Sequence, residues 1–159
     1  MTKNIYLGGP LFSEMEIAFN IGLETKIKEK FGESVSIYNP CNNGEINDKS
    51  NYADSIMIAN GDNAYLEEAD ILVAVLDGQT MDVGLAAEIG YFFSMNKPII
   101  ALYSDTRQGN VTEEKTAALD KIAESQWSYI NLYVVGLIKQ RGVIVGSSDE
   151  VLDALSEYL

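Results

Sequence analysis

The feature that most constrains this fold is a continuous apolar run, Ile71 to Leu76, followed by a turn and a helix. The run is rich in β-branched residues, which is typical of a strand buried on both faces of a parallel sheet. Asp77-Gly78 ends that strand. From Val83 to Phe93 the apolar residues recur at helical spacing, and Asp82 stands where a helix N-cap belongs. The segment therefore predicts a buried strand, a loop at the sheet edge and a helix.

Glu88 lies inside this predicted helix, with apolar residues on both sides in the sequence. A carboxylate in such a setting is desolvated unless a partner pairs with it or it takes part in chemistry. Taken alone, Glu88 fits a buried structural acid as well as it fits a catalytic one, and Asp82 fits a plain N-cap. Both acids are candidates that need support from the rest of the chain.

Strand-like and helix-like segments alternate along the chain. The expected strands are Ile5–Leu7, Val35–Tyr38, Ile71–Leu76, Ile99–Tyr103 and Val143–Val145. The expected helices are one that opens with a Ser13/Glu16 capping box and ends at Gly32, Tyr52–Glu68 with a break near Asn60-Gly61, Val83–Phe93, Thr112–Glu124, Ser128–Gln140, and a last helix capped by Ser148. This alternation predicts an α/β fold, a single domain over residues 1–159 with a doubly wound, flavodoxin-like parallel sheet of about five strands.

In such sheets ligands bind beyond the carboxyl ends of the strands. That edge is expected to collect Gly8 to Phe12, Asp77 to Asp82 and the start of the helix that carries Glu88. Gly8-Gly9-Pro10 allows the backbone to turn sharply and to come close to a ligand. The polar stretch Asn42 to Asn51 is expected to be a loop over this site.

The composition restricts the chemistry. The chain contains no histidine, which excludes Ser-His and Cys-His nucleophile pairs, histidine metal sites and an imidazole base. Acid–base work must fall to Asp, Glu, Tyr or Lys. The sequence has no Walker phosphate loop and no G-x-G-x-x-G motif, so no nucleotide cofactor is expected. Cys41 is the single cysteine and has neither metal-ligand spacing nor a partner for an internal disulfide.

The charge balance restricts the partners. A formal net charge of -13 repels a nucleic-acid backbone and an anionic membrane surface, whereas an uncharged or cationic small ligand is accommodated more easily. No apolar run reaches membrane-spanning length and no secretory leader is recognisable. We therefore expect a soluble, cytoplasmic protein that binds neither nucleic acid nor membrane.

Four segments together resemble the nucleoside 2-deoxyribosyltransferase family. They are Ile5-Tyr6-Leu7-Gly8-Gly9-Pro10-Leu11-Phe12, Asp62 eight residues before Asp70-Ile71, Asp82-Val83-Gly84-Leu85-Ala86-Ala87-Glu88-Ile89-Gly90-Tyr91, and Asn131-Leu132-Tyr133. The central segment is the specific one. The resemblance implies a retaining transfer of 2-deoxyribose between purine or pyrimidine bases in nucleoside salvage, without metal or cofactor.

The resemblance also implies roles for individual residues. Glu88 is implied to be the nucleophile that forms a covalent deoxyribosyl-enzyme, with Tyr6 orienting its carboxylate. Asp62 and Asp82 are implied to contact base and sugar, and either one could donate the proton to the leaving base. The implied substrate-binding residues are Gly8, Gly9, Phe12, Asp77, Asn131 and Tyr133. Asn131 and Tyr133 are implied to reach the sugar of a neighbouring subunit in a homo-oligomer.

Two other functions stay open. A 2-deoxynucleoside 5-phosphate N-hydrolase of the same superfamily would use the same glutamate with water as acceptor, although the glycine turn holds no basic residue for a phosphate. A receiver-like signalling domain would be phosphorylated on Asp77. That reading lacks an acid pair after the first strand and a lysine after the fourth.

Overall fold

The computed structural model describes residues 2–44, 54–106, 113 and 130–159. In these ranges five parallel strands form one sheet in the order β2-β1-β3-β4-β5. The strands are β1 (Lys3–Gly8), β2 (Val35–Tyr38), β3 (Ile71–Val75), β4 (Ile99–Leu102) and β5 (Gly142–Val145). The helices are α1 (Glu14–Phe31), α3 (Ser55–Glu68), α4 (Val83–Ser94), α6 (Leu132–Arg141) and α7 (Ser148–Ser156), with short 3-10 turns η1 (Gly32–Ser34) and η2 (Pro40–Asn42).

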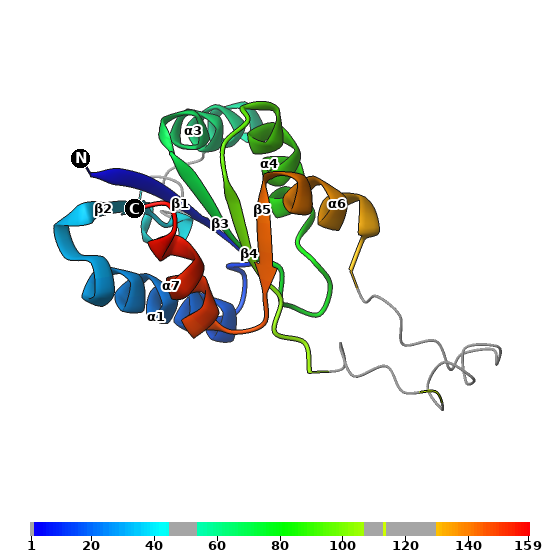
Figure 1. Cartoon of the computed structure of the whole chain (residues 1–159). Coiled ribbons are helices and arrows are strands. Elements are labelled where there is room, and N and C mark those ends of the chain that lie inside the picture. The colour runs from blue at the N-terminus through cyan, green and yellow to red at the C-terminus, as the bar shows by residue number, and fades with distance from the viewer. Residues whose placement is uncertain (1, 45–53, 107–112, 114–129) are drawn as a thin grey trace.

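The sheet lies between two layers of helices (Figure 1). Helices α3, α4 and α6 cover one face, and α1 and α7 cover the other. Side chains alternate between the two cores along each strand, so Tyr6 points to one face while Ile5 and Leu7 point to the other. All five residues of β3 are buried, as its continuous apolar sequence predicts. The predicted doubly wound, flavodoxin-like α/β fold is confirmed.

Several helix ends agree with the sequence patterns. Ser13 and Glu16 form the expected capping box at the start of α1, and Gly32 is the C-cap of that helix. Asp82 caps α4 through a hydrogen bond that its side chain accepts from the backbone N–H of Leu85. These caps fix where the helices begin and end because the first N–H groups of a helix lack partners inside it.

Three predicted details are wrong. α3 runs without a break through Asn60-Gly61, because the cost of a helical glycine is small compared with tertiary packing. α6 begins at Leu132, since Asn131 is its N-cap, and not at Ser128. Ser147, not Ser148, caps α7. Nearly all of the predicted helix Thr112–Glu124 and most of the predicted loop Asn42–Asn51 lie outside the described residues.

Glycine at position 142 allows β5 to approach β4 closely. Gly142 is paired with Ile99, and a Cβ atom added at Gly142 would lie 1.9 Å from the carbonyl oxygen of Ile99. Any larger residue there would push the two strands apart, so this position is closed to side chains for steric reasons alone. Among the helices that the structure describes, none combines the length and the apolar character needed to cross a bilayer.

Candidate functional site

Glu88 and Tyr6 form the centre of a cluster of polar side chains beside β1. Asp82 starts α4 at the loop after β3, and Glu88 follows in the second turn of this helix. The half-buried Glu88 faces Tyr6, a fully buried residue of β1, whose hydroxyl donates a hydrogen bond of 2.7 Å to Oε1 of Glu88. Tyr6 on β1 and Glu88 on α4 are 82 positions apart in the sequence. The packing of α4 against the sheet brings them together.

The surroundings of Glu88 disfavour its charge. The pKa of its carboxyl is raised to about 7: burial is the main cause, the hydrogen bond from Tyr6 acts in the opposite direction, and the negative charges of Asp62 and Asp82 add to the rise. Burial and the charge of Glu88 raise the pKa of the Tyr6 hydroxyl well above its ordinary value, so Tyr6 stays a donor. Burial also raises the pKa of Asp62. The site therefore holds one carboxyl group, that of Glu88, whose pKa of about 7 lets it exchange its proton close to neutrality.

The glycine turn leaves open the space next to the second oxygen of Glu88. A Cβ atom at Gly8 would lie 3.1 Å from Oε2 of Glu88 and 2.8 Å from Cδ1 of Leu85. At Gly9 a Cβ atom would lie 3.0 Å from Cβ of Val75 and 3.2 Å from Oδ1 of Asn20. No side chain fits at either position without displacing its neighbours. The backbone of β1 can therefore pass directly over the Glu88 carboxylate.

Two further tyrosines extend the wall of the site. The Tyr38 ring lies 5.3 Å from the Tyr6 ring and stacks on Tyr65 with centroids 3.5 Å apart. Asn43 donates a hydrogen bond of 3.0 Å to the Tyr38 hydroxyl. Burial raises the pKa of Tyr38, and the negative charge of Asp62 contributes to the rise. Neither tyrosine was predicted from the sequence to belong to the site. The position of Tyr38 at the carboxyl end of β2 was the available signal.

Asp77 has a different place from the Glu88 cluster. Its two carboxylate oxygens accept hydrogen bonds from the backbone N–H and the hydroxyl of Ser104, at 2.7 Å and 2.6 Å. These bonds tie the loop after β3 to the loop after β4. Phe12, by contrast, is 81% exposed beside the glycine turn, so its ring is available to a ligand or to a partner.

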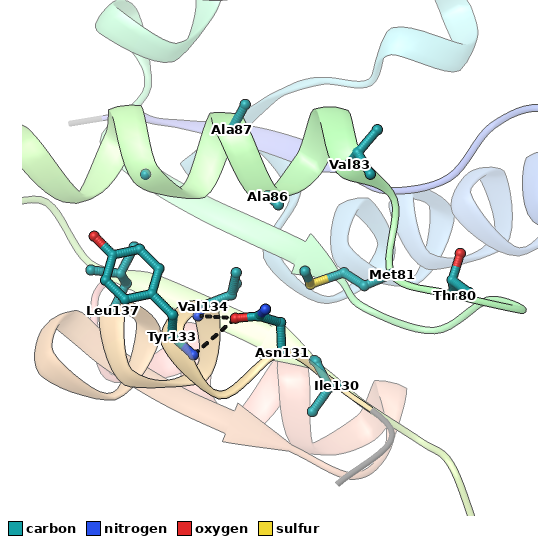
Figure 2. Close-up of a pocket in the computed structure, with 11 residues that line it drawn as sticks. Thr80, Met81, Val83, Ala86, Ala87, Ile130, Asn131, Tyr133, Val134 and Leu137 are labelled. Atoms are coloured by element: carbon teal, nitrogen blue, oxygen red, sulfur yellow. Dashed lines mark hydrogen bonds between the residues drawn. The ribbon is translucent and has the colours of Figure 1, made fainter.

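Asn131 and Tyr133 line a cavity between α4 and α6 (Figure 2). The cavity has a volume of about 590 Å³ and is lined by Thr80, Met81, Val83, Ala86, Ala87, Gly90, Ile130, Asn131, Tyr133, Val134 and Leu137. Glu88 does not line it, because residues 86 and 90 lie on a different side of α4 from residue 88. Oδ1 of Asn131 accepts hydrogen bonds from the N–H groups of Tyr133 and Val134. The chain by itself does not bring Asn131 or Tyr133 to Glu88.

Six of the positively charged side chains that the structure describes have partners outside this cluster. Lys3 pairs with Asp70, Lys26 with Asp149, Lys28 with Glu24 and Lys30 with Asp153. Lys97 donates to the backbone carbonyls of Glu67 and Ala69, and the Arg141 guanidinium lies over the Phe93 ring. Within the described ranges, no group of three or more His, Cys, Asp or Glu side chains is placed to hold a metal ion. The chemistry available to the described cluster is that of carboxyl and phenol groups.

Comparison with known proteins identifies a family that this chain matches and solved structures that it resembles. Residues 5–123 match the nucleoside 2-deoxyribosyltransferase family. A conserved protein from Enterococcus faecalis is 43% identical, with a TM-score of 0.93 and complete coverage of both chains. A 2-deoxyribosyltransferase from Leishmania mexicana is 20% identical, with a TM-score of 0.65 over 98% of this chain and 96% of that one. A CMP N-glycosidase from Clostridium botulinum is 17% identical, with a TM-score of 0.51 over 99% of this chain and 100% of that one. The last two share the fold.

Proposed function

Because the chain belongs to the nucleoside 2-deoxyribosyltransferase family, we propose that it transfers 2-deoxyribose between nucleobases with retention of configuration, in nucleoside salvage. The observation that best supports this proposal is the environment of the two carboxylate oxygens of Glu88. Its Oε1 is held by Tyr6 at 2.7 Å, and its Oε2 lies under the glycine turn, where no side chain intervenes. Tyr6 fixes one carboxylate oxygen, and we assign to the other the bond to the reacting carbon.

The reaction then proceeds in two displacements at C1 of the sugar. Ionised Glu88 stabilises the oxocarbenium-like transition state and its Oε2 bonds to C1, while the bond from C1 to the base nitrogen breaks. The departing base keeps the electron pair of that bond and takes a proton from a carboxylic acid. A second base attacks C1 from the face that the first base left, and the bond from C1 to Oε2 breaks to release the Glu88 carboxylate. The incoming base gives its N–H proton to the carboxylate that protonated the first base, which restores the acid. Two inversions give net retention.

Asp62 is the better placed of the two candidate proton donors. Burial raises its pKa, so a protonated form persists closer to neutrality, as a general acid requires. Asp82 instead uses Oδ1 to accept the N–H of Leu85 at the start of α4. We assign proton donation to Asp62, and to Asp82 the capping of α4 together with a contact to sugar or base through its other oxygen.

The electrostatics favour an uncharged nucleoside over a nucleotide. In the described part of the chain, no lysine or arginine hydrogen-bonds or pairs with Tyr6, Asp62, Asp82 or Glu88. A substrate phosphate beside three carboxyl groups would be repelled. The fold similarity to a CMP N-glycosidase makes hydrolysis of a 2-deoxynucleoside 5-phosphate the second candidate function.

We also propose that a second copy of the chain completes the site. Leu132 and Tyr133 are 69% and 75% exposed at the start of α6, and the adjoining cavity is mainly apolar (Figure 2). Asn131 and Tyr133 do not reach Glu88 within one chain but are free to reach the site of a neighbour. A homo-oligomer would bury this exposed apolar edge.

The test is chromatography of the purified protein with deoxyinosine, with and without free adenine, beside the Glu88→Ala variant. We expect the native protein to form deoxyadenosine only when adenine is present, and the variant to form none. If deoxyinosine stays intact while deoxyinosine monophosphate is hydrolysed, the hydrolase function replaces the transferase. If the variant keeps the native rate, Glu88 is not the nucleophile.

A further inference from the structure

A second polar cluster lies on the opposite face of the sheet, around Glu24 of α1. The side chain of Glu24 is buried, with the residue 7% exposed. Its Oε2 accepts hydrogen bonds of 2.8 Å from the side-chain amides of both Asn39 and Asn42, and its Oε1 pairs with Lys28. A buried carboxylate with three donors is an ordered anchor and not a reactive group. The proposed reaction does not use it.

The same helix also holds the glycine turn. Asn20, one helical turn before Glu24, is 2% exposed. Its side-chain amide donates to the carbonyl of Pro10 at 2.8 Å and to Sγ of Cys41 at 3.6 Å. Asn20 and Glu24 are spaced to lie on one face of a helix. Together they fasten the loop after β1 and the loop after β2 to a single helical surface.

The β2 loop in turn contacts the candidate active site. Asn39 accepts the N–H of Cys41 and is the N-cap of η2, so the Glu24 bonds fix both ends of that short turn. The next residue, Asn43, donates to the Tyr38 hydroxyl, and the Tyr38 ring packs beside Tyr6. A continuous series of contacts therefore joins Glu24 to the wall of the Glu88 site.

We propose that Glu24 is a positioning residue: it holds the Asn39–Asn43 loop so that Tyr38 forms one side of the nucleoside-binding site. This inference rests on the proposed deoxyribosyl transfer. It predicts that loosening the loop weakens substrate binding while leaving the covalent chemistry at Glu88 intact. The KM for the deoxynucleoside should rise and kcat should stay nearly constant.

Glu24→Gln is the direct test. The NH2 group of a glutamine at this position would face either the amides of Asn39 and Asn42 or the Lys28 ammonium. In both arrangements hydrogen-bond donors face each other and no acceptor lies between them. We expect KM to rise by about tenfold, with kcat within about twofold of the native value. Glu29→Gln is the matched control, because Glu29 is an exposed glutamate of the same helix. Its kinetics should equal those of the native protein.

A reciprocal exchange separates positioning from general damage. Asn39→Asp alone would place two carboxylates together and should raise KM. In the Glu24→Gln/Asn39→Asp double variant the glutamine NH2 can donate to the new carboxylate, which can still accept the Cys41 N–H. Because the Asn42 amide still faces the glutamine NH2 group, we expect the double variant to recover part of the native KM, measured well below the unfolding temperature of each variant. Impairment equal to the sum of the two single variants would overturn the inference.

Cys41 supplies a readout that does not depend on catalysis. It is the single thiol of the chain and it contacts Asn20 inside this loop, so a thiol reagent such as dithionitrobenzoate reports loop opening. Glu24→Gln should react several times faster than the native protein and Glu29→Gln should not. Faster labelling with an unchanged KM would overturn the positioning role. If native protein turns over no deoxynucleoside, the proposed function and this role both fail, while the labelling rates still show whether Glu24 holds the loop.

Discussion

Glu24 and Glu88 lie on helices that cover opposite faces of the sheet. Both carboxylates face loops at the carboxyl ends of the strands. Glu24 receives three side-chain donors, one of them a lysine. Glu88 receives one donor, from Tyr6, and has Asp62 and Asp82 as acidic neighbours. A carboxylate with all its partners orders the chain around it, whereas one that lacks partners keeps its capacity to react. In the proposed function, this difference in partners separates a structural acid, Glu24, from a catalytic one, Glu88.

The largest expected difference between the two acids is in turnover. Glu88→Gln removes the proposed nucleophile but keeps an oxygen that can accept the Tyr6 hydroxyl, so the fold should persist. We expect the rate of base exchange to fall by at least about 1000-fold, measured by chromatography of deoxyinosine with adenine. Glu24→Gln, the same substitution on the other face, should keep kcat. A Glu88→Gln rate within tenfold of the native rate would contradict the assignment.

The next largest effect is expected at the glycine turn. In Gly8→Ala the added methyl would press on Leu85 and on the reactive oxygen of Glu88, at 2.8 Å and 3.1 Å. Displacement of the nucleophile by a fraction of an ångström should lower kcat by about 10-fold to 100-fold. Gly22→Ala in α1 is the control, because a Cβ atom there meets no atom within 4 Å. An unchanged rate for Gly8→Ala would mean that the turn does not confine Glu88.

The two acids should also differ in the sign of their effect on stability. The pKa of Glu88 is raised in the folded state to about 7 from 4.5, so the folded protein binds the proton more tightly than the unfolded chain. Its contribution to stability is complete below about pH 4.5 and is lost as the pH rises through about 7. At pH 8 Glu88→Gln should therefore increase the free energy of unfolding, by up to about 3 kcal/mol.

Glu24→Gln should have the opposite effect, because it leaves buried donors facing each other. We expect the free energy of unfolding to fall by about 1–3 kcal/mol. Urea denaturation followed by circular dichroism at pH 8 measures both variants against the native protein, with Glu29→Gln as the control. If Glu88→Gln and Glu24→Gln change the free energy of unfolding in the same direction, the two acids do not differ in their effect on stability in the way described.

The fold and the centre of the site were accessible from the sequence because both depend on local patterns. Apolar runs such as Ile71 to Leu76 predicted the strands, and the parallel sheet follows from their alternation with helices. Glu88 could be selected as a candidate because a charged residue interrupts an apolar helical pattern. Asp82 was found because helix caps have a strong residue preference.

The sequence could not indicate features that depend on contacts between distant segments. The stack of Tyr38 on Tyr65 and the bonds from Asn39 and Asn42 to Glu24 join residues from different elements. A periodic sequence pattern does not indicate which side chain a loop residue will contact. Asn131 and Tyr133 illustrate the same limit, because α6 places them on a cavity away from Glu88. Local sequence identifies a residue type and its element, but tertiary packing decides its partner.

The smallest expected effect is a displacement of the pH profile by Tyr6→Phe. Glu88 must be ionised to attack C1, so kcat/KM should fall as the pH drops below about 7, the pKa of its carboxyl. The Tyr6 hydrogen bond lowers that pKa. Its removal should therefore move the acidic limb of the profile to higher pH. Tyr38→Phe is the matched control, because the hydroxyl of this neighbouring tyrosine accepts from Asn43 and the Glu88 hydrogen bond stays in place. If Tyr38→Phe shifts the acidic limb as far as Tyr6→Phe does, the effect belongs to the tyrosine wall as a whole. It then does not come from the single hydrogen bond that Tyr6 donates to Glu88.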